Sequence, residues 1–82
     1  MNKIRLVVVD DHALFRAGLV SLLSGMPELE IVGEAGDGYQ ALGVVERTQP
    51  DVVLLDVNMP EMGGIDTVHA LRSSAVQARI LM

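Results

Sequence analysis

The sequence predicts an α/β fold, in which an open parallel β-sheet carries helices on both faces. Short continuous apolar runs alternate along the chain with stretches whose apolar residues recur every three or four positions. These are the patterns of buried strands and of helices with one buried face. The predicted order, β-α-β-α-β-α-β, requires right-handed crossovers between parallel strands. A length of 82 residues, 50% of them hydrophobic, allows a single domain over residues 1–82.

The first part of the chain predicts two strands and the helix between them. Residues 4–9 form a β-branched run, typical of a strand buried on both faces. A helix is predicted over residues 13–23, and Gly25 and Pro27 end it. Residues 29–35 alternate in part between apolar and acidic side chains, as an outer strand would. The buried stripe predicted for the helix consists of Leu14, Phe15, Leu19, Leu22 and Leu23.

The second part predicts a helix, a strand, a third helix and a fourth strand. Asp37 is expected to cap the first of these helices, with Gln40 at the capping-box position and Pro50 after its end. Residues 52–55 form another fully apolar strand, and residues 78–82 begin the fourth. The predicted stripes of the two helices are Ala41, Leu42, Val44 and Val45, and then Ile65, Val68 and Leu71.

The composition excludes several functional classes. Six Lys and Arg against eleven Asp and Glu give a net charge of −5, and the cations are scattered, so we expect no direct nucleic-acid binding. The absence of cysteine excludes disulfides, thiol catalysis and cysteine-bound zinc. The longest apolar runs are far too short to span a membrane, and the N-terminus lacks the pattern of a signal peptide. We therefore expect a cytoplasmic protein without membrane contact.

Acidic side chains follow two of the predicted strands. Asp10 and Asp11 come after the first strand, and Asp56 comes after the third. If these strands are neighbours, the three carboxylates meet at the edge of the sheet where ligands bind in open parallel folds. Three such anions need a cation among them, and an all-oxygen site suits Mg²⁺ or Mn²⁺. The alternatives are helix capping by Asp10 or Asp11 and a solvated loop position for Asp56.

Two motifs resemble the receiver domain of two-component response regulators. One is the Asp10–Asp11 pair after an apolar strand; the other is Asp-Val-Asn-Met-Pro-Glu-Met-Gly-Gly, residues 56–64, after another strand. Residues 10–19 further resemble the subfamily whose receivers precede a LuxR/NarL-type DNA-binding domain. The resemblance implies a three-layer, flavodoxin-like fold and a non-enzymatic, phosphorylation-controlled switch in transcription regulation.

The resemblance also implies a role for each site residue. Asp56 would accept a phosphoryl group from a phosphohistidine of a sensor histidine kinase. Asp11 and Asp56 would bind Mg²⁺ directly, Asp10 would act through a metal-bound water, and Asn58 would contribute its backbone carbonyl. Because the phosphoryl transition state spreads charge over oxygens, the protein need only position the groups and neutralise that charge.

The sequence departs from the family pattern at its end. Receivers carry a Thr or Ser after the fourth strand and a Lys after the fifth, whereas residues 1–82, about two-thirds of such a domain, end at Met82 before either. Loss of one such donor commonly costs ~3 kcal/mol of transition-state stabilisation, which argues against phosphotransfer by this chain alone. The alternative is a receiver fragment that acts only in assembly. The edge at residues 80–82 predicts self-association through the fourth strand or by exchange of elements.

Two remaining features have plain explanations. The stretch Gly36-x-Gly38-x-x-Ala41 fits the fingerprint of a nucleotide-binding enzyme, but a glycine-rich turn with an Asp helix cap explains the same residues and is preferred. The two histidines, His12 and His69, are interpreted as ordinary surface or boundary residues rather than a metal pair.

Overall fold

The computed structural model of the chain describes residues 3–56, 69 and 79–81. The elements in chain order are β1 (Ile4–Val9), α1 (Ala13–Ser24), β2 (Leu29–Ala35), α2 (Gly38–Thr48), β3 (Val52–Leu55) and β4 (Arg79–Leu81). Each agrees with a predicted element to within about two residues. The predicted third helix, with its stripe of Ile65, Val68 and Leu71, lies outside the described residues.

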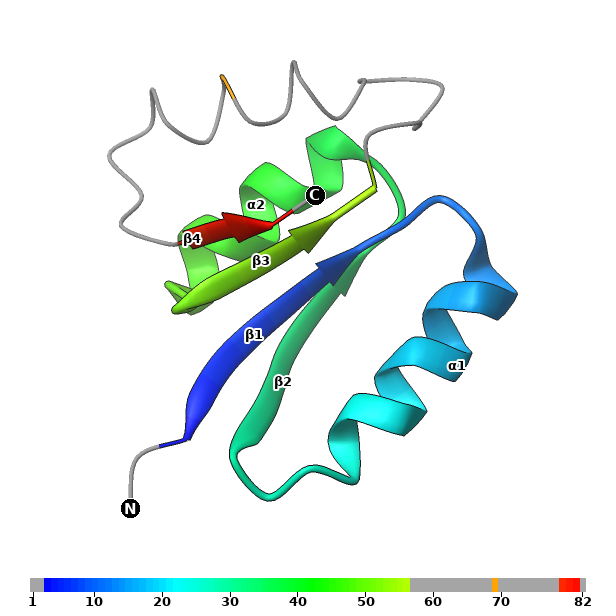
Figure 1. Ribbon diagram of the computed structural model, residues 1–82. Coiled ribbons are helices and arrows are strands. Elements are labelled where there is room, and N and C mark those ends of the chain that lie inside the picture. Colours follow the sequence, from blue (N-terminus) through cyan, green and yellow to red (C-terminus); the bar gives the residue numbers. More distant parts are fainter. Residues whose placement is uncertain (1–2, 57–68, 70–78, 82) are drawn as a thin grey trace.

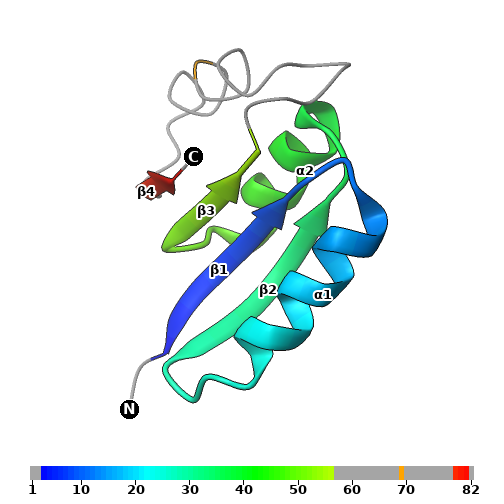
Figure 2. The ribbon, with the colours of Figure 1, turned by 45° about the vertical axis from the view of Figure 1, so that its right-hand side comes forward.

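The strands form one parallel sheet in the order β2-β1-β3-β4 (Figure 1). The chain moves outward from β1 to β2 and then crosses back over β1 to reach β3. The order of strands therefore reverses between β1 and β3, which is the topological switch point where open α/β sheets bind ligands. Figure 2 shows α1 and α2 on opposite faces of the sheet, so the described chain has the three layers of a flavodoxin-like fold.

The hydrophobic core lies between the sheet and α2. Fully buried valines from three elements, Val7, Val45 and Val53, meet there. The predicted stripe of α2 is confirmed, because Ala41, Val44 and Val45 are buried and Leu42 packs against the core. Gly33 allows the helix to approach β2 closely, since a Cβ at that position would lie 2.5 Å from Val44 Cγ1.

The stripe predicted for α1 is only partly right. Leu14, Phe15 and Leu22 are exposed, and none of the twelve residues of α1, all of which the structure describes, is buried. The half-buried face keeps Leu19 and Leu23 of the predicted stripe and adds Arg16 and Val20. Because α1 is apolar on several sides, spacing alone does not identify the side that faces the sheet.

The start of α2 is fixed by its own side chains. Asp37 Oδ1 accepts the Gln40 backbone N–H at 2.7 Å, and Gln40 Oε1 accepts the Gly36 backbone N–H at 3.0 Å. The predicted cap is confirmed, although Gln40 reaches back to the residue before Asp37 rather than to Asp37 itself. Among the described residues, no helix is long and apolar enough to cross a membrane.

Candidate metal site

Two parallel strands bring the three predicted carboxylates together. In the β1–β3 pairing Val9 lies opposite Leu55, so the residues that follow, Asp10 and Asp56, come side by side at the switch point. The Asp56 N–H donates to Val9 O at 3.0 Å, and the Asp10 N–H donates to Ala35 O at 3.1 Å. These backbone hydrogen bonds extend the sheet one residue beyond the strands and fix both aspartates to its rim. The predicted convergence is confirmed.

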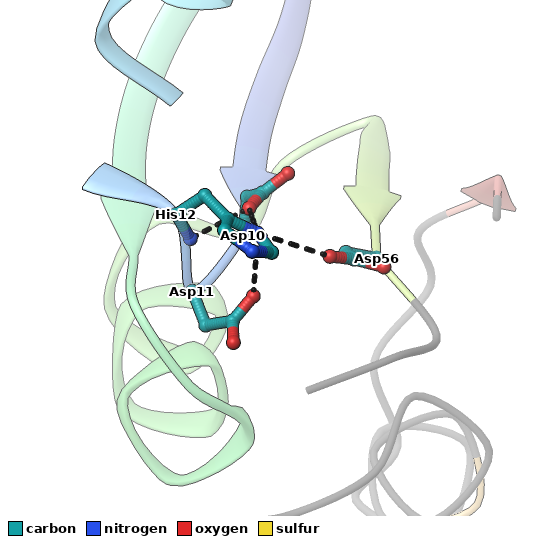
Figure 3. A group of neighbouring side chains, drawn as sticks. All are labelled: Asp10, Asp11, His12 and Asp56. Carbon is teal, nitrogen blue, oxygen red and sulfur yellow. Dashed lines mark hydrogen bonds and ion pairs between the residues drawn. The ribbon is translucent and has the colours of Figure 1, made fainter. Parts of the chain in front are cut away.

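We call the group formed by Asp10, Asp11, His12 and Asp56 the acidic pocket (Figure 3). One ligating atom from each residue lies within 4.8 Å of all the others. The Asp10 side chain is only 9% exposed, and those of Asp11 and Asp56 are largely covered as well. Carboxylates this close and this poorly hydrated repel one another unless a positive charge lies among them.

The capping alternative for the Asp pair is wrong. The residue that caps α1 is His12, in extended backbone, and within this fully described helix end no side chain makes a capping hydrogen bond. Asp10 Oδ1 instead accepts the His12 backbone N–H at 2.8 Å, an Asx-type turn that holds the carboxylate at the rim. The loop alternative for Asp56 fits poorly, because its side chain is mostly covered.

Asp11 supplies a test of whether a cation fits the pocket. Its Oδ1 is buried and, among the described residues, has no hydrogen-bond partner. His12 Nδ1 lies 3.0 Å away from it as an ion-pair contact. A buried, unsatisfied carboxylate oxygen is costly in a protein, whereas Mg²⁺ takes one or two carboxylates directly together with water. The pocket therefore fits a hard divalent cation. Asn58, predicted to supply a backbone carbonyl, lies outside the described residues.

His12 is a pocket residue that the sequence interpretation missed. Its side chain is 70% exposed, as expected of a surface histidine, yet Nδ1 contacts all three carboxylates. The available signal was its position directly after an Asp pair at the end of a buried strand. The other histidine, His69, is exposed and is not one of the four pocket residues.

Arg16, on the half-buried face of α1, was also missed. Its Nη1 donates to the backbone carbonyl of Asp10, and its Nε donates to Glu34 Oε1 at 3.3 Å. The guanidinium thus joins α1 to the ends of β1 and β2 and holds the rim that carries the pocket. Such a cation also offsets part of the local negative charge.

The glycine motif at residues 36–41 forms a capped turn. The Asp37 carboxylate occupies the N-terminus of α2, where a dinucleotide-binding site would hold the pyrophosphate. The Gly36 N–H is likewise bound by Gln40. These contacts favour the capped-turn interpretation over the nucleotide-binding one.

A flavodoxin-like sheet with three aspartates at its switch point defines a receiver-type α/β module. The family described as the response regulator receiver domain matches residues 6–82. The chain belongs to this family.

Known relatives agree with the assignment. Transcriptional regulatory protein DegU of Brevibacillus brevis is 40% identical over 81 residues, which are 99% of this chain and 34% of that protein. A protein-glutamate methylesterase/protein-glutamine glutaminase of Pyrococcus abyssi is 48% identical over 70 residues, which are 85% of this chain and 19% of that protein. The solved signal receiver domain of the response regulator NarL from Mycobacterium tuberculosis superposes with a TM-score of 0.90 at 45% identity, covering 98% of this chain and 64% of that one.

Proposed function

We propose that the chain is a cytoplasmic phosphoacceptor switch in which Asp56 receives a phosphoryl group from a phosphohistidine of a sensor histidine kinase. The observation that carries the proposal is the register of β1 and β3, which sets Asp56 beside Asp10 at the switch point of a receiver fold. A lone exposed acid would not support this role. Two partly covered acids next to a nucleophilic carboxylate do, because they create a place for a cation at the reacting group.

The proposed transfer needs little from the protein beyond position and charge. A carboxylate oxygen of Asp56 attacks phosphorus while the bond from phosphorus to the histidine nitrogen breaks, and that electron pair stays on the imidazole, which takes up a proton. The product is an acyl phosphate on Asp56. The Asp56 backbone N–H, bonded to Val9 O at 3.0 Å, holds the nucleophile at the rim, and Arg16 holds the Asp10 backbone beside it.

Asp11 and Asp56 would hold Mg²⁺ directly, Asp10 would hold it through water, and the Asn58 carbonyl would complete the protein ligands. When bound, Mg²⁺ neutralises the charge on the transferring phosphoryl oxygens. The buried and unsatisfied Asp11 Oδ1 supports this assignment.

Acetyl phosphate with Mg²⁺, followed by intact mass measurement, tests the proposal. The wild-type chain is expected to gain the mass of one phosphoryl group, slowly and only with Mg²⁺ present. Asp56→Asn should abolish the gain. Asp51→Asn is the matched control, because Asp51 is exposed directly before the same strand. Asparagine keeps an oxygen that can accept the Arg5 N–H, as Asp51 Oδ2 does at 2.9 Å, so this variant should label like the wild type. A wild-type chain that stays unlabelled would favour the assembly-only alternative.

Transcription control is the proposed output, since DegU is a transcriptional regulator and residues 10–19 resemble the LuxR/NarL subfamily. The similarity to a methylesterase indicates that receivers of this kind also accompany enzymes. We assign no catalysis of its own to this segment and place any DNA contact outside it.

Self-association is a further part of the proposal. In the described sheet β4 is an edge strand, bonded to β3 on one side only, and such an edge can pair with a second chain. Sedimentation velocity over a range of concentrations should show a dimer that increases with concentration. A monomer at every concentration would overturn this part alone.

A further inference from the structure

His12 places one ring nitrogen among the carboxylates of the acidic pocket (Figure 3). Nδ1 lies 3.0 Å from Asp11 Oδ1, 3.2 Å from Asp10 Oδ1 and 3.9 Å from Asp56 Oδ2. The side chain is 70% exposed, so burial does not force the ring into this position. Its placement therefore reflects what the nitrogen contacts.

One ring nitrogen cannot satisfy three carboxylates. A nitrogen of the imidazole ring carries either one proton or one lone pair, and thus serves one partner at a time. The contact with Asp10 has hydrogen-bond geometry, which leaves Asp11 Oδ1 buried and, within the described chain, without such a bond. A divalent cation among these atoms would be held by several of them at once, directly or through water, with Nδ1 as a further ligand.

The distances fit a shared cation. Metal–ligand bonds of about 2.1 Å in an octahedral site place adjacent ligand atoms about 3.0 Å apart and opposite ones about 4.2 Å apart. The three separations from Nδ1, at 3.0, 3.2 and 3.9 Å, fall within this range, and all four ligating atoms lie within 4.8 Å of one another. When Nδ1 ligates a metal, the Nε2–H of the exposed ring can donate to water.

We propose that His12 Nδ1 is a side-chain ligand of the pocket and makes it bind Co²⁺, Ni²⁺ and Zn²⁺ more tightly than an all-carboxylate site would. The inference shares one premise with the proposed function, namely that the carboxylates of the acidic pocket bind a divalent cation. Imidazole nitrogen suits these borderline metals, whereas Mg²⁺ takes oxygen ligands. His12 therefore determines which metals compete for the pocket and leaves Mg²⁺ to the aspartates.

Calorimetric titration of Ni²⁺ alone and of Mg²⁺ alone into wild type, His12→Ala and His69→Ala tests the inference. His12→Ala should lower the Ni²⁺ affinity at least tenfold. Removing a residue that only supports a metal ligand already costs about tenfold or more in affinity, and loss of the ligand itself should cost no less. Its Mg²⁺ affinity should remain within about twofold of wild type. His69→Ala is the matched control and should change neither affinity. Because His12 is exposed, its removal should not unfold the chain, and far-UV circular dichroism checks this.

Nitrogen NMR of ¹⁵N-histidine-labelled protein gives a second readout. The chain has only two histidines, and the His69→Ala spectrum assigns the His12 ring. Zn²⁺ should shift the His12 Nδ1 resonance, and Mg²⁺ should leave it in place. Equal Ni²⁺ affinities of wild type and His12→Ala, or an unmoved His12 resonance at saturating Zn²⁺, would overturn the inference. A wild-type chain that binds Ni²⁺ through His12 but fails to bind Mg²⁺ would instead count against the proposed function.

Discussion

The two helices on opposite faces of the sheet contribute very differently to the fold. α2 adds four buried residues to the core, whereas α1, which is described in full, adds none. The buried residues of α2 are Gly38, Ala41, Val44 and Val45. A side-chain cap also fixes the start of α2, while α1 has no such cap and is joined to the ends of β1 and β2 by Arg16. Within the described residues, α2 thus closes a core on its face of the sheet, whereas α1 leaves several of its apolar side chains exposed, and we call the α1 side the open side.

This difference shows how the fold separates stability from binding. On the α1 side, Val8, Phe15, Leu19 and Leu54 line an open apolar groove that leads to Asp10, His12 and Asp56. The strands that carry the acidic pocket are fixed from behind by the α2 core, and the pocket itself faces the open side. Rigid strands hold the carboxylates in place, and the open side leaves room for a ligand to approach.

The largest expected effect comes from a charge introduced into the closed face. Val45 is fully buried in the core, so Val45→Asp places a carboxylate among apolar side chains without a partner. That penalty is comparable to the whole stability of a small domain, which begins at ~5 kcal/mol. We expect loss of the cooperative thermal transition in circular dichroism. Leu14→Asp, at a position 89% exposed on α1, should fold like the wild type. A folded Val45→Asp protein would contradict the assignment of the core to this face.

Adding a methyl group where β2 meets α2 should lower the free energy of unfolding, and adding one on α1 should raise it. Gly33→Ala brings a Cβ within 2.5 Å of Val44 Cγ1, and a branched side chain on a helix has little freedom to move away. The expected loss is ~1–3 kcal/mol in denaturant unfolding. Gly18→Ala, in α1 with nothing within 4 Å of the new Cβ, should instead stabilise by up to ~1 kcal/mol through helix propensity.

A double variant checks the cause of the Gly33 effect. Val44→Ala removes the Cγ1 atom that the new methyl group would meet, so Gly33→Ala should cost less in that background than in the wild type. Equal costs in the two backgrounds would mean that the strain lies in the backbone of β2 rather than in the contact between β2 and α2.

Features of the fold that depend on residues close together in the sequence could be predicted, and features that depend on specific tertiary contacts could not. Asp37 and Gln40 lie three residues apart, so the start of α2 was predictable. The convergence of Asp10 and Asp56 followed from topology, because carboxyl ends of neighbouring parallel strands share one rim. The orientation of α1 was not predictable, since apolar residues surround much of that helix. The positions of the His12 ring and the Arg16 guanidinium depend on contacts made only after the strands assemble.

The smallest expected effect tests whether the α1 face remains open in solution. Leu22 is 66% exposed, so Leu22→Gln removes little buried apolar surface and should change the free energy of unfolding by less than ~0.5 kcal/mol. Denaturant titrations at two protein concentrations differing by two orders of magnitude provide the measurement. Val53→Ala, at a fully buried position, is the control and should cost ~2 kcal/mol at both concentrations. A cost for Leu22→Gln that appears only at the higher concentration would mean that a second copy covers α1. If Leu22→Gln strongly lowers the free energy of unfolding at both concentrations, then Leu22 is buried within the monomer. The contrast drawn between α1 and α2 would then be wrong.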